Sequence, residues 1–306
     1  MRRVLVVFLD GVGLGADDPA RNPFAAAEMP EMTRLLGGAR LLEGTVPYEG
    51  PLATLVAVDA CLGVPGAPQS ATGQAALVTG RNVPQALGEH YGPKPNPAVA
   101  QLVREDNIFH QVLRRGGRAA LLNAYPPRYF EGIESGRRLY SSIPLAAVAA
   151  GLALRTAEDL AAENALSADF TGLGWASQPG FPPAPVYEAA QAGQRLADLA
   201  ETNELSWFDF WLSDLVGHHG SMEEALGLLQ SVDAVLGGLA RAWEGGPNLI
   251  VITADHGNLE SLGQRGHTRN PVPGLLIGPL DLRRRFAAGL SDLTGFAPAI
   301  LRTIFD

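Results

Sequence analysis

Acidic residues follow three apolar segments of this 306-residue sequence. Asp10 follows VLVVFL, Asp214 follows WFDFWLS and Asp255 follows NLIVITA. If these segments are parallel strands, their carboxyl ends meet at one edge of the sheet, which is where such sheets bind ligands. A single Asp after a strand is usually a helix cap. Three of them at one edge predict a carboxylate cluster that can hold metal ions.

Histidines accompany the carboxylates in the C-terminal part of the sequence. His218 stands four residues after Asp214, one helical turn away, so both side chains can reach one ion. His256 follows Asp255 directly, and His267 stands in the Gly-rich segment GQRGHTRNPVP. A buried core histidine is the usual alternative, but these three stand in polar segments beyond strands. Carboxylate and imidazole together suit borderline divalent ions such as Mn²⁺ or Zn²⁺.

Six Asp and His ligands are too many for one tetrahedral ion and suit two ions. Two neighbouring divalent ions form a clamp for in-line displacement at phosphorus, in which one activates the nucleophile and the other holds the leaving or incoming oxygen. His219, Asn258 and Thr268 stand beside the ligands and are candidates for groups that orient them. The spacing therefore predicts a two-metal phosphoryl-transfer site.

A hydroxyl nucleophile is expected where a helix begins at the same edge. The segment PQSATGQAALVTGRN supplies Ser70 and Thr72 at the start of a helix predicted over residues 72–79. Free N–H groups and the positive end of the helix dipole stabilise a phosphate at such a position. An ordinary helix cap uses the same residue types, but the metal ligands expected nearby favour a nucleophile.

Strands and helices must alternate to position these residues. Apolar runs predict strands over residues 4–9, 119–122, 207–212, 248–253 and 272–277. Helices are predicted over residues 107–115, 142–165, 186–201, 222–243 and 296–304, with loops over 172–185 and between Asp214 and residue 222. This alternation predicts an α/β fold with a doubly wound, mainly parallel sheet and helices on both faces.

The composition of the chain argues against several classes of protein. A net charge of −9 argues against a nucleic-acid partner, whereas bound metal ions would still attract a small phosphorylated substrate. Cys61 is the sole cysteine, so no intramolecular disulfide is expected and the predicted location is the cytoplasm. The apolar run from Val4 to Leu9 meets Asp10 too early for a signal peptide, and no membrane span is predicted. The oligomeric state stays open.

Four segments resemble the alkaline phosphatase superfamily, and within it cofactor-independent phosphoglycerate mutase and phosphopentomutase. They are LDGVGLG, QSATGQAALVTGRN, SDLVGHHGSMEEALGLLQSVDAVLG and ITADHGNLES…GHTRNPVP. The resemblance covers approximately residues 1–82 and 204–306. It implies two ligand sets, the first Asp214, His218 and His267 and the second Asp10, Ser70, Asp255 and His256.

The resemblance also implies that phosphate passes to Ser70 and then to water or back to the substrate. The distance in sequence from Ser70 to Gly80 fits the nucleophile of phosphodiesterase relatives, which favours Ser70 over Thr72. The sequence departs from the mutases at Gln74, where they carry histidine. It also has no room for their large phosphate-gripping domain, and its only lysine, Lys94, stands outside the segments of resemblance.

The resemblance implies an alkaline phosphatase-like catalytic core, residues 1–84 and 191–306, with a small inserted cap over residues 85–190. Arg128 and Tyr129 in the cap are candidate substrate contacts. The small cap favours a phosphohydrolase or phosphodiesterase that acts on a small phosphorylated metabolite with two divalent ions, Mn²⁺ or Zn²⁺. A phosphomutase is the alternative reaction, because a mutase needs a closing lid. A non-catalytic metal-binding relative is the alternative from another class.

Overall fold

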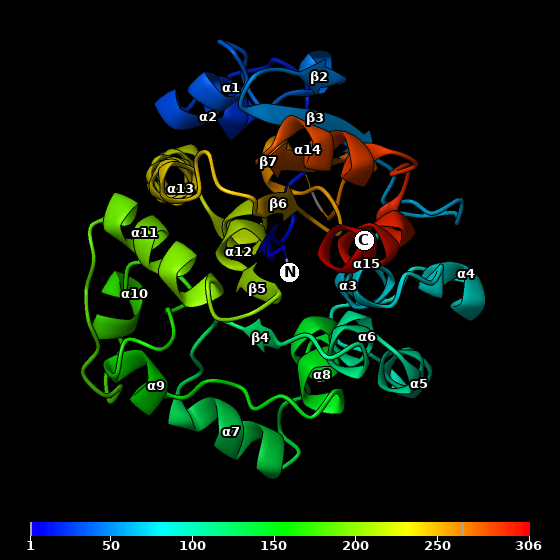
Figure 1. The fold of residues 1–306 in the computed structure, drawn as a ribbon, viewed down its shortest axis with the longest axis vertical. Helices are drawn as coiled ribbons and strands as arrows, with labels where there is room; N and C mark the ends of the chain where they lie inside the picture. Colours follow the sequence, from blue (N-terminus) through cyan, green and yellow to red (C-terminus); the bar gives the residue numbers. More distant parts are fainter. Residues whose placement is uncertain (1, 265) are drawn as a thin grey trace.

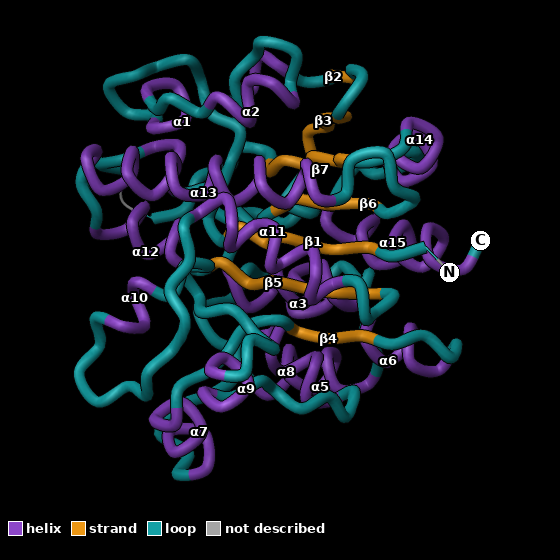
Figure 2. Tube along the Cα trace, turned by 60° about the vertical axis from the view of Figure 1, so that its left-hand side comes forward, coloured by secondary structure: helices purple, strands orange, loops and turns teal. Residues whose placement is uncertain are grey.

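A seven-stranded sheet forms the centre of the computed structural model, which describes residues 2–264 and 266–306. The strands lie in the order β2-β3-β7-β6-β1-β5-β4 and are seen side by side in Figure 2. Their bounds are β1 Val4–Leu9, β2 Tyr48–Glu49, β3 Ala53–Val58, β4 Ala119–Leu121, β5 Leu205–Phe210, β6 Leu249–Thr253 and β7 Val272–Ile277.

The central part of the sheet is parallel. β1 pairs in parallel with β5 and β6, and β5 pairs in parallel with β4. β7, β3 and β2 extend the sheet, and each of them runs antiparallel to the strand before it. β1, β5 and β6 are buried along their whole length, because helices cover both faces. This burial explains why β1 and β6 are almost entirely apolar in the sequence, whereas β5 carries the buried polar residues Ser206 and Asp209.

Helices lie on both faces of the sheet (Figure 1). α11 (Ala189–Ala200) and α13 (Met222–Ala242) pack together on one face, and α3 (Ser70–Thr79) lies on the other with α8 (Ser142–Ala149) and α15 (Phe296–Phe305). The remaining helices are α1 Pro23–Ala26, α2 Pro30–Leu35, α4 Val83–Leu87, α5 Pro97–Glu105, α6 Ile108–Arg114, α7 Pro127–Glu134, α9 Ala157–Ala161, α10 Leu173–Ala176, α12 Leu212–His219 and α14 Leu280–Ala287. The predicted fold class is confirmed.

Aromatic side chains pack against both faces of β5. Trp207 lies between Phe8 of β1 and Phe109 of α6, with ring centroids 6.4 Å and 6.3 Å away. On the opposite face, Phe170 stacks on Phe208 at 4.3 Å. Successive side chains of a strand point to opposite faces, so β5 is held from both sides. The helix α12, which begins two residues after β5, is therefore fixed at its start.

Three predicted elements are wrong, and one of them is the loop predicted over residues 172–185, which contains the helix α10. The helix predicted over residues 142–165 is two helices, because Gly151 adopts φ +83° after α8 and Thr156 starts α9 with a capping box. The loop predicted after Asp214 is largely the helix α12, which ends at His219.

The division into a core and an inserted cap stays a prediction. Part of the range 85–190 is built into the central layers, since β4 pairs with β5 and the helices α5 and α8 pack on α3. In Figure 1, α7 and α9 lie beyond the β4 edge and α10 lies near α11, so a separate cap would include α7, α9 and their loops. None of the helices in the described residues is long and apolar enough to cross a membrane.

Candidate metal centre

Neighbouring strands carry the three acidic residues to one edge of the sheet. Asp10 directly follows β1, Asp255 follows β6, and Asp214 lies in the first turn of α12, just after β5. β1 lies between β5 and β6 in the sheet. Since the three strands are parallel, their carboxyl ends adjoin, and the acidic residues meet although they are far apart in sequence.

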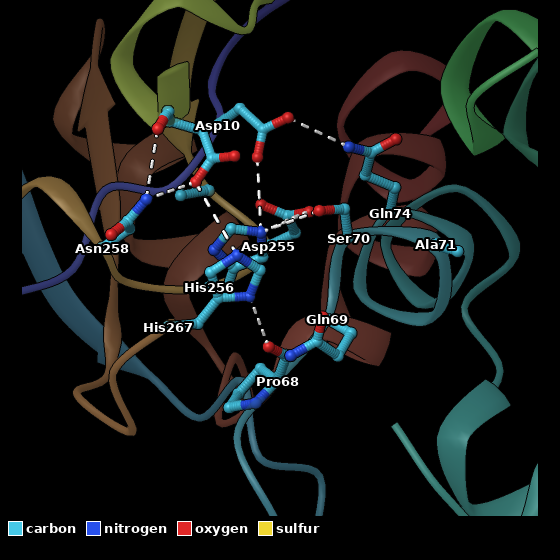
Figure 3. A network of polar contacts seen from close by, with 12 residues as sticks. Asp10, Pro68, Gln69, Ser70, Ala71, Gln74, Asp255, His256, Asn258 and His267 are labelled. Atoms are coloured by element: carbon cyan, nitrogen blue, oxygen red, sulfur yellow. Dashed lines mark hydrogen bonds and ion pairs between the residues drawn. The ribbon is translucent and has the colours of Figure 1, made fainter. Parts of the chain in front are cut away.

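The first group of side chains surrounds His256 (Figure 3). Its Nε2 atom lies 3.0 Å from Ser70 Oγ, 3.4 Å from Asp10 Oδ1 and 3.6 Å from Asp255 Oδ2. Potential ligand atoms of Asp10, Asp255 and His256 all lie within 4.8 Å of one another. The structure thus brings together all four members of the second ligand set.

The second group contains Asp214, His218 and His267. The Nε2 atoms of the two histidines are 3.1 Å apart, and Asp214 oxygens lie 3.4 Å and 3.8 Å from them. Atoms bound to one ion at about 2.0–2.2 Å lie about 3–4 Å from one another, so this spacing suits a shared ion. The His267 ring stacks on His256 with centroids 3.6 Å apart, which places the two groups side by side.

The centre contains buried polar atoms that lack a hydrogen-bond partner. Among the described residues, Asp10 Oδ1, both carboxylate oxygens of Asp255 and His256 Nδ1 have none. Asp255 and His256 have no exposed surface. A buried charge without a partner is costly, and bound cations would remove that cost. The residues present therefore fit divalent ions.

The electrostatics of the centre favour a cation. Burial raises the pKa of Asp10 well above its usual range, and repulsion from Asp255 and Asp214 adds to this effect. Burial likewise raises the pKa of Asp255, again with repulsion from Asp214. Burial lowers the pKa of His256, and the neighbouring His267 lowers it further. Neutral imidazoles beside crowded carboxylates provide the lone pairs and the negative charge that a divalent ion needs.

Ser70 is the first residue of α3, and its hydroxyl faces the metal centre. The N-cap of this helix is Gln69, so Ser70 is free of the capping role that was its alternative. Thr72 is turned away, because its hydroxyl donates to the carbonyl oxygens of Gln69 and Tyr91. Gln74 donates from Nε2 to Asp10 Oδ2 at 3.2 Å and so occupies the other side of that carboxylate.

Side chains around the ligands hold them in place. Asn258 donates from Nδ2 to Asp214 Oδ1 at 2.7 Å, which agrees with its expected orienting role. Thr268 does not touch a ligand side chain directly but donates its hydroxyl to the buried Glu260. The sequence reasoning did not identify Glu260. The only signal for it was an acid in the segment DHGNLES, close to a predicted ligand pair.

The centre opens toward solvent beside His218. His218 and His219 line a surface hollow together with Gln264. The ring centroid of His219 lies 5.9 Å from that of His218, and the two rings are tilted by 42°. Of the predicted ligands among the described residues, His218 alone lines this hollow.

The predicted substrate contacts of the cap lie apart from the ligand groups. The Arg128 guanidinium lies over Phe181, 4.4 Å from the ring centroid, while Tyr129 is buried against Tyr125, with centroids 4.4 Å apart. Contact of either residue with substrate stays a prediction. Lys94 is solvent-accessible, yet crowding by the surrounding protein lowers its pKa, which the Asp209 and Asp10 carboxylates partly restore.

The fold is that of an α/β protein, and its buried Asp–His cluster is a candidate metal centre. Residues 183–302 match the model of the family described as the Metalloenzyme superfamily. The chain is 38% identical over 98 residues to the 2,3-bisphosphoglycerate-independent phosphoglycerate mutase of Pseudomonas syringae, which covers 30% of this chain and 19% of that protein. It is 33% identical over 127 residues to the same enzyme of Rhodopseudomonas palustris, covering 39% and 24%. The chain thus spans about a quarter or less of these relatives' length.

Solved structures resemble the whole chain. Alkaline phosphatase from the Antarctic bacterium TAB5 matches with a TM-score of 0.54 and 12% identity, covering 99% of this chain and 97% of that one. Leishmania mexicana phosphoglycerate mutase matches with a TM-score of 0.50, also at 12% identity, covering 99% and 95%. At such identities the likeness concerns the fold. Together with the family match, it confirms the predicted resemblance to the alkaline phosphatase superfamily.

Proposed function

We propose that this chain is a two-metal phosphoryl-transfer enzyme that acts as a phosphohydrolase or phosphodiesterase on a small phosphorylated metabolite. One observation carries the proposal: the Ser70 hydroxyl lies 3.0 Å from His256 Nε2 inside a buried cluster of unpartnered carboxylate oxygens. A cluster that served only structure would need no hydroxyl at the start of a helix facing it. The names of the relatives, phosphoglycerate mutase and alkaline phosphatase, support the same reaction class.

Two sets of residues would hold the ions, which we propose to be Mn²⁺ or Zn²⁺. The first set is Asp214, His218 and His267 and the second is Asp10, Ser70, Asp255 and His256. When bound, such ions supply Lewis acidity that favours a serine alkoxide and offsets negative charge at phosphorus. His256 borders both groups, since Asp214, His256 and His267 also offer ligand atoms within 4.8 Å of one another.

Residues of the chain would carry out the remaining steps of the reaction. Ser70 Oγ would release its proton to water and form a bond to phosphorus while the bond from phosphorus to the leaving oxygen breaks, and the leaving oxygen would take a proton from water to depart as the alcohol. Water then attacks the phosphoserine, releases phosphate or a phosphomonoester, and regenerates Ser70. At the start of α3 the Thr72 N–H donates to the Tyr91 carbonyl, so the N–H groups of Ser70 and Ala71 would be the ones to donate toward the transferred phosphoryl oxygens. Gln74 and Asn258 keep the carboxylates of Asp10 and Asp214 in fixed orientations.

A phosphomutase is the second candidate, because the relatives with the highest identities reported above are named phosphoglycerate mutases. A mutase must exclude water and grip the non-transferred end of its substrate. In this chain, the region of α7, α9 and α10 would have to exclude water and bind that end of the substrate. A non-catalytic metal-binding relative is the third reading. The presence of Ser70 together with every predicted ligand in one cluster opposes it.

Turnover assays distinguish these reactions. The protein, supplied with Mn²⁺ or Zn²⁺, is incubated with an aryl phosphate, an aryl phosphodiester, 3-phosphoglycerate and a pentose 1-phosphate. Release of aryl alcohol or phosphate that disappears in Ser70→Ala supports the hydrolase. Isomerised glycerate or pentose phosphate without free phosphate supports the mutase. Full activity of Ser70→Ala would refute the nucleophile, and no turnover by a metal-loaded protein would favour the non-catalytic reading.

A further inference from the structure

We propose that Glu260 is a positioning residue for the metal centre: its carboxylate ties together the loops that carry the ligands without contacting an ion itself. The inference rests on the metal centre of the proposed function and not on which phosphate ester is the substrate. Glu260 belongs to the short 3₁₀ helix Leu259–Ser261 and is 3% exposed.

Four donors converge on the two oxygens of this carboxylate. Oε2 accepts from the backbone N–H of Gly13 at 2.9 Å and from that of Asn258 at 2.8 Å. Oε1 accepts from the side-chain amide of Asn270 at 3.0 Å and from the hydroxyl of Thr268. Each oxygen is thus shared by two donors, and together they fill the acceptor positions that a buried carboxylate offers.

Each donor stands next to a ligand of the centre. Gly13 comes three residues after Asp10, and Thr268 directly follows His267. Asn258 comes two residues after His256 and itself donates to the Asp214 carboxylate. The contacts with Glu260 therefore join the segments after β1 and β6 to the segment before β7. Through Asn258 they also reach the helix α12.

The packing around Glu260 leaves no room for adjustment. A Cβ atom added at Gly13 or at Gly257 would overlap the Glu260 carboxyl group, and one at Gly15 would lie 2.8 Å from its Cγ. Glycine at these positions allows the backbone to approach the carboxylate. The close approach fixes the distance between the loop after Asp10 and the loop after His256.

A carboxylate satisfies all four donors as they stand. Glutamine has nearly the same shape, but its NH₂ group could be accommodated only opposite the Thr268 hydroxyl and the Asn270 side-chain amide, and only if both turned to accept from it. That change would break the present contacts of the segment that follows His267 and would shift this segment. Residues that orient metal ligands change metal affinity by about 10–100-fold when they are replaced. Glu260→Gln is therefore expected to weaken metal binding by that factor.

Calorimetric titration of the chelator-treated full chain with Mn²⁺ and with Zn²⁺ tests this proposal. Asp233→Asn is the matched control, because Asp233 is a buried carboxylate that accepts from the backbone N–H groups of Glu31 and Met32, away from the centre. We expect both variants to lower the midpoint of thermal unfolding. Only Glu260→Gln should lose metal affinity, by about tenfold or more, while Asp233→Asn stays within twofold of wild type.

An affinity of Glu260→Gln within twofold of wild type would overturn the proposal, as would an equal loss in Asp233→Asn. If Glu260→Gln does not fold, Thr268→Val replaces it. This variant removes one donor at similar volume and should still bind the ion less tightly than wild type, and equal binding overturns the proposal. A wild-type protein that binds ions but hydrolyses or isomerises no phosphate ester contradicts the proposed function alone. Wild-type protein that binds neither Mn²⁺ nor Zn²⁺ overturns both.

Discussion

Ser70 and His256 are 186 residues apart in the sequence, and the contact between their side chains indicates the chemistry of the site. A hydroxyl held 3.0 Å from an imidazole nitrogen is common in proteins. Here the imidazole has no exposed surface and lies 3.4 Å and 3.6 Å from two carboxylates. A serine in such surroundings is suited to become a nucleophile once the negative charge of the carboxylates is balanced by cations.

Asp209 is a further buried carboxyl beside the centre, and its ionisation should control stability. Burial raises its pKa from 3.8 to about 7, although Lys94 opposes this. A folded-state pKa above the unfolded value means that the folded protein holds the proton more tightly. Stability is therefore lost as the pH rises from about 4 to about 7.

The variant Asp209→Asn removes this titration. We expect its advantage in unfolding free energy over wild type to grow by about 3 kcal/mol between pH 5 and pH 8 and then to level off. Urea unfolding of both chelator-treated proteins across this pH range measures the difference. A difference that does not change with pH would show that Asp209 is not buried as the structure describes.

At the scale of elements, the strands that carry the ligands were predictable from sequence. β1, β5 and β6 are buried on both faces, so each is a largely apolar run that ends at an acid. The cluster of Asp10, Asp214 and Asp255 followed from the parallel arrangement alone. The metal-ligand roles themselves stay predictions.

Other features were out of reach of local sequence reasoning. β3 was not predicted, although its segment ATLVAV is largely apolar and four of its six residues are buried. The role of Glu260 depends on a hydrogen bond to Gly13, which is 247 residues away in the sequence. A contact between residues so far apart leaves no periodic pattern in the local sequence. The break in the helix predicted over residues 142–165 depends on Gly151, whose φ of +83° ends α8.

The packing of α12 against the loop after β6 allows a test at this scale. A Cβ atom at Gly217 would lie 2.7 Å from the Asn258 side chain, which holds the Asp214 carboxylate. Gly217→Ala should therefore displace Asn258 and lower metal affinity. Gly227 in α13 is the matched control, because an added Cβ meets nothing within 4 Å there.

Gly227→Ala should leave metal affinity unchanged and raise stability by about 0.5–1 kcal/mol, the usual gain for alanine over glycine inside a helix. Metal titration and chemical unfolding of both variants provide the two readouts. Equal metal affinities in Gly217→Ala and Gly227→Ala would contradict the role assigned to the α12 contact.

For the whole molecule, the sheet is a rigid frame that concentrates negative charge at one edge. The chain has a net charge of −9, and carboxylates without partners are buried at the centre. Burial of these carboxylates destabilises the metal-free protein but creates a site that can bind cations. The fold without ions should therefore be less stable than its large buried core would otherwise allow.

Metal binding should reverse this loss of stability. At a free ion concentration of about 100 times the dissociation constant, binding to the folded state adds about 2.7 kcal/mol. Thermal unfolding of chelator-treated protein, with and without added Mn²⁺ or Zn²⁺, measures the effect. Asp255→Asn should be more stable than wild type without metal, because it removes a buried charge, and should respond less to added ions. An unfolding midpoint unchanged by either ion would argue against a metal centre.

The most direct test of the central claim is to trap the phosphorylated enzyme. The metal-loaded protein is mixed with a phosphate ester that it turns over, quenched rapidly, digested and examined by mass spectrometry. We predict a phosphate on the peptide that carries Ser70, absent from Ser70→Ala, which should also have lost turnover. Turnover that persists in Ser70→Ala, or a phosphate found on another side chain, would contradict the account.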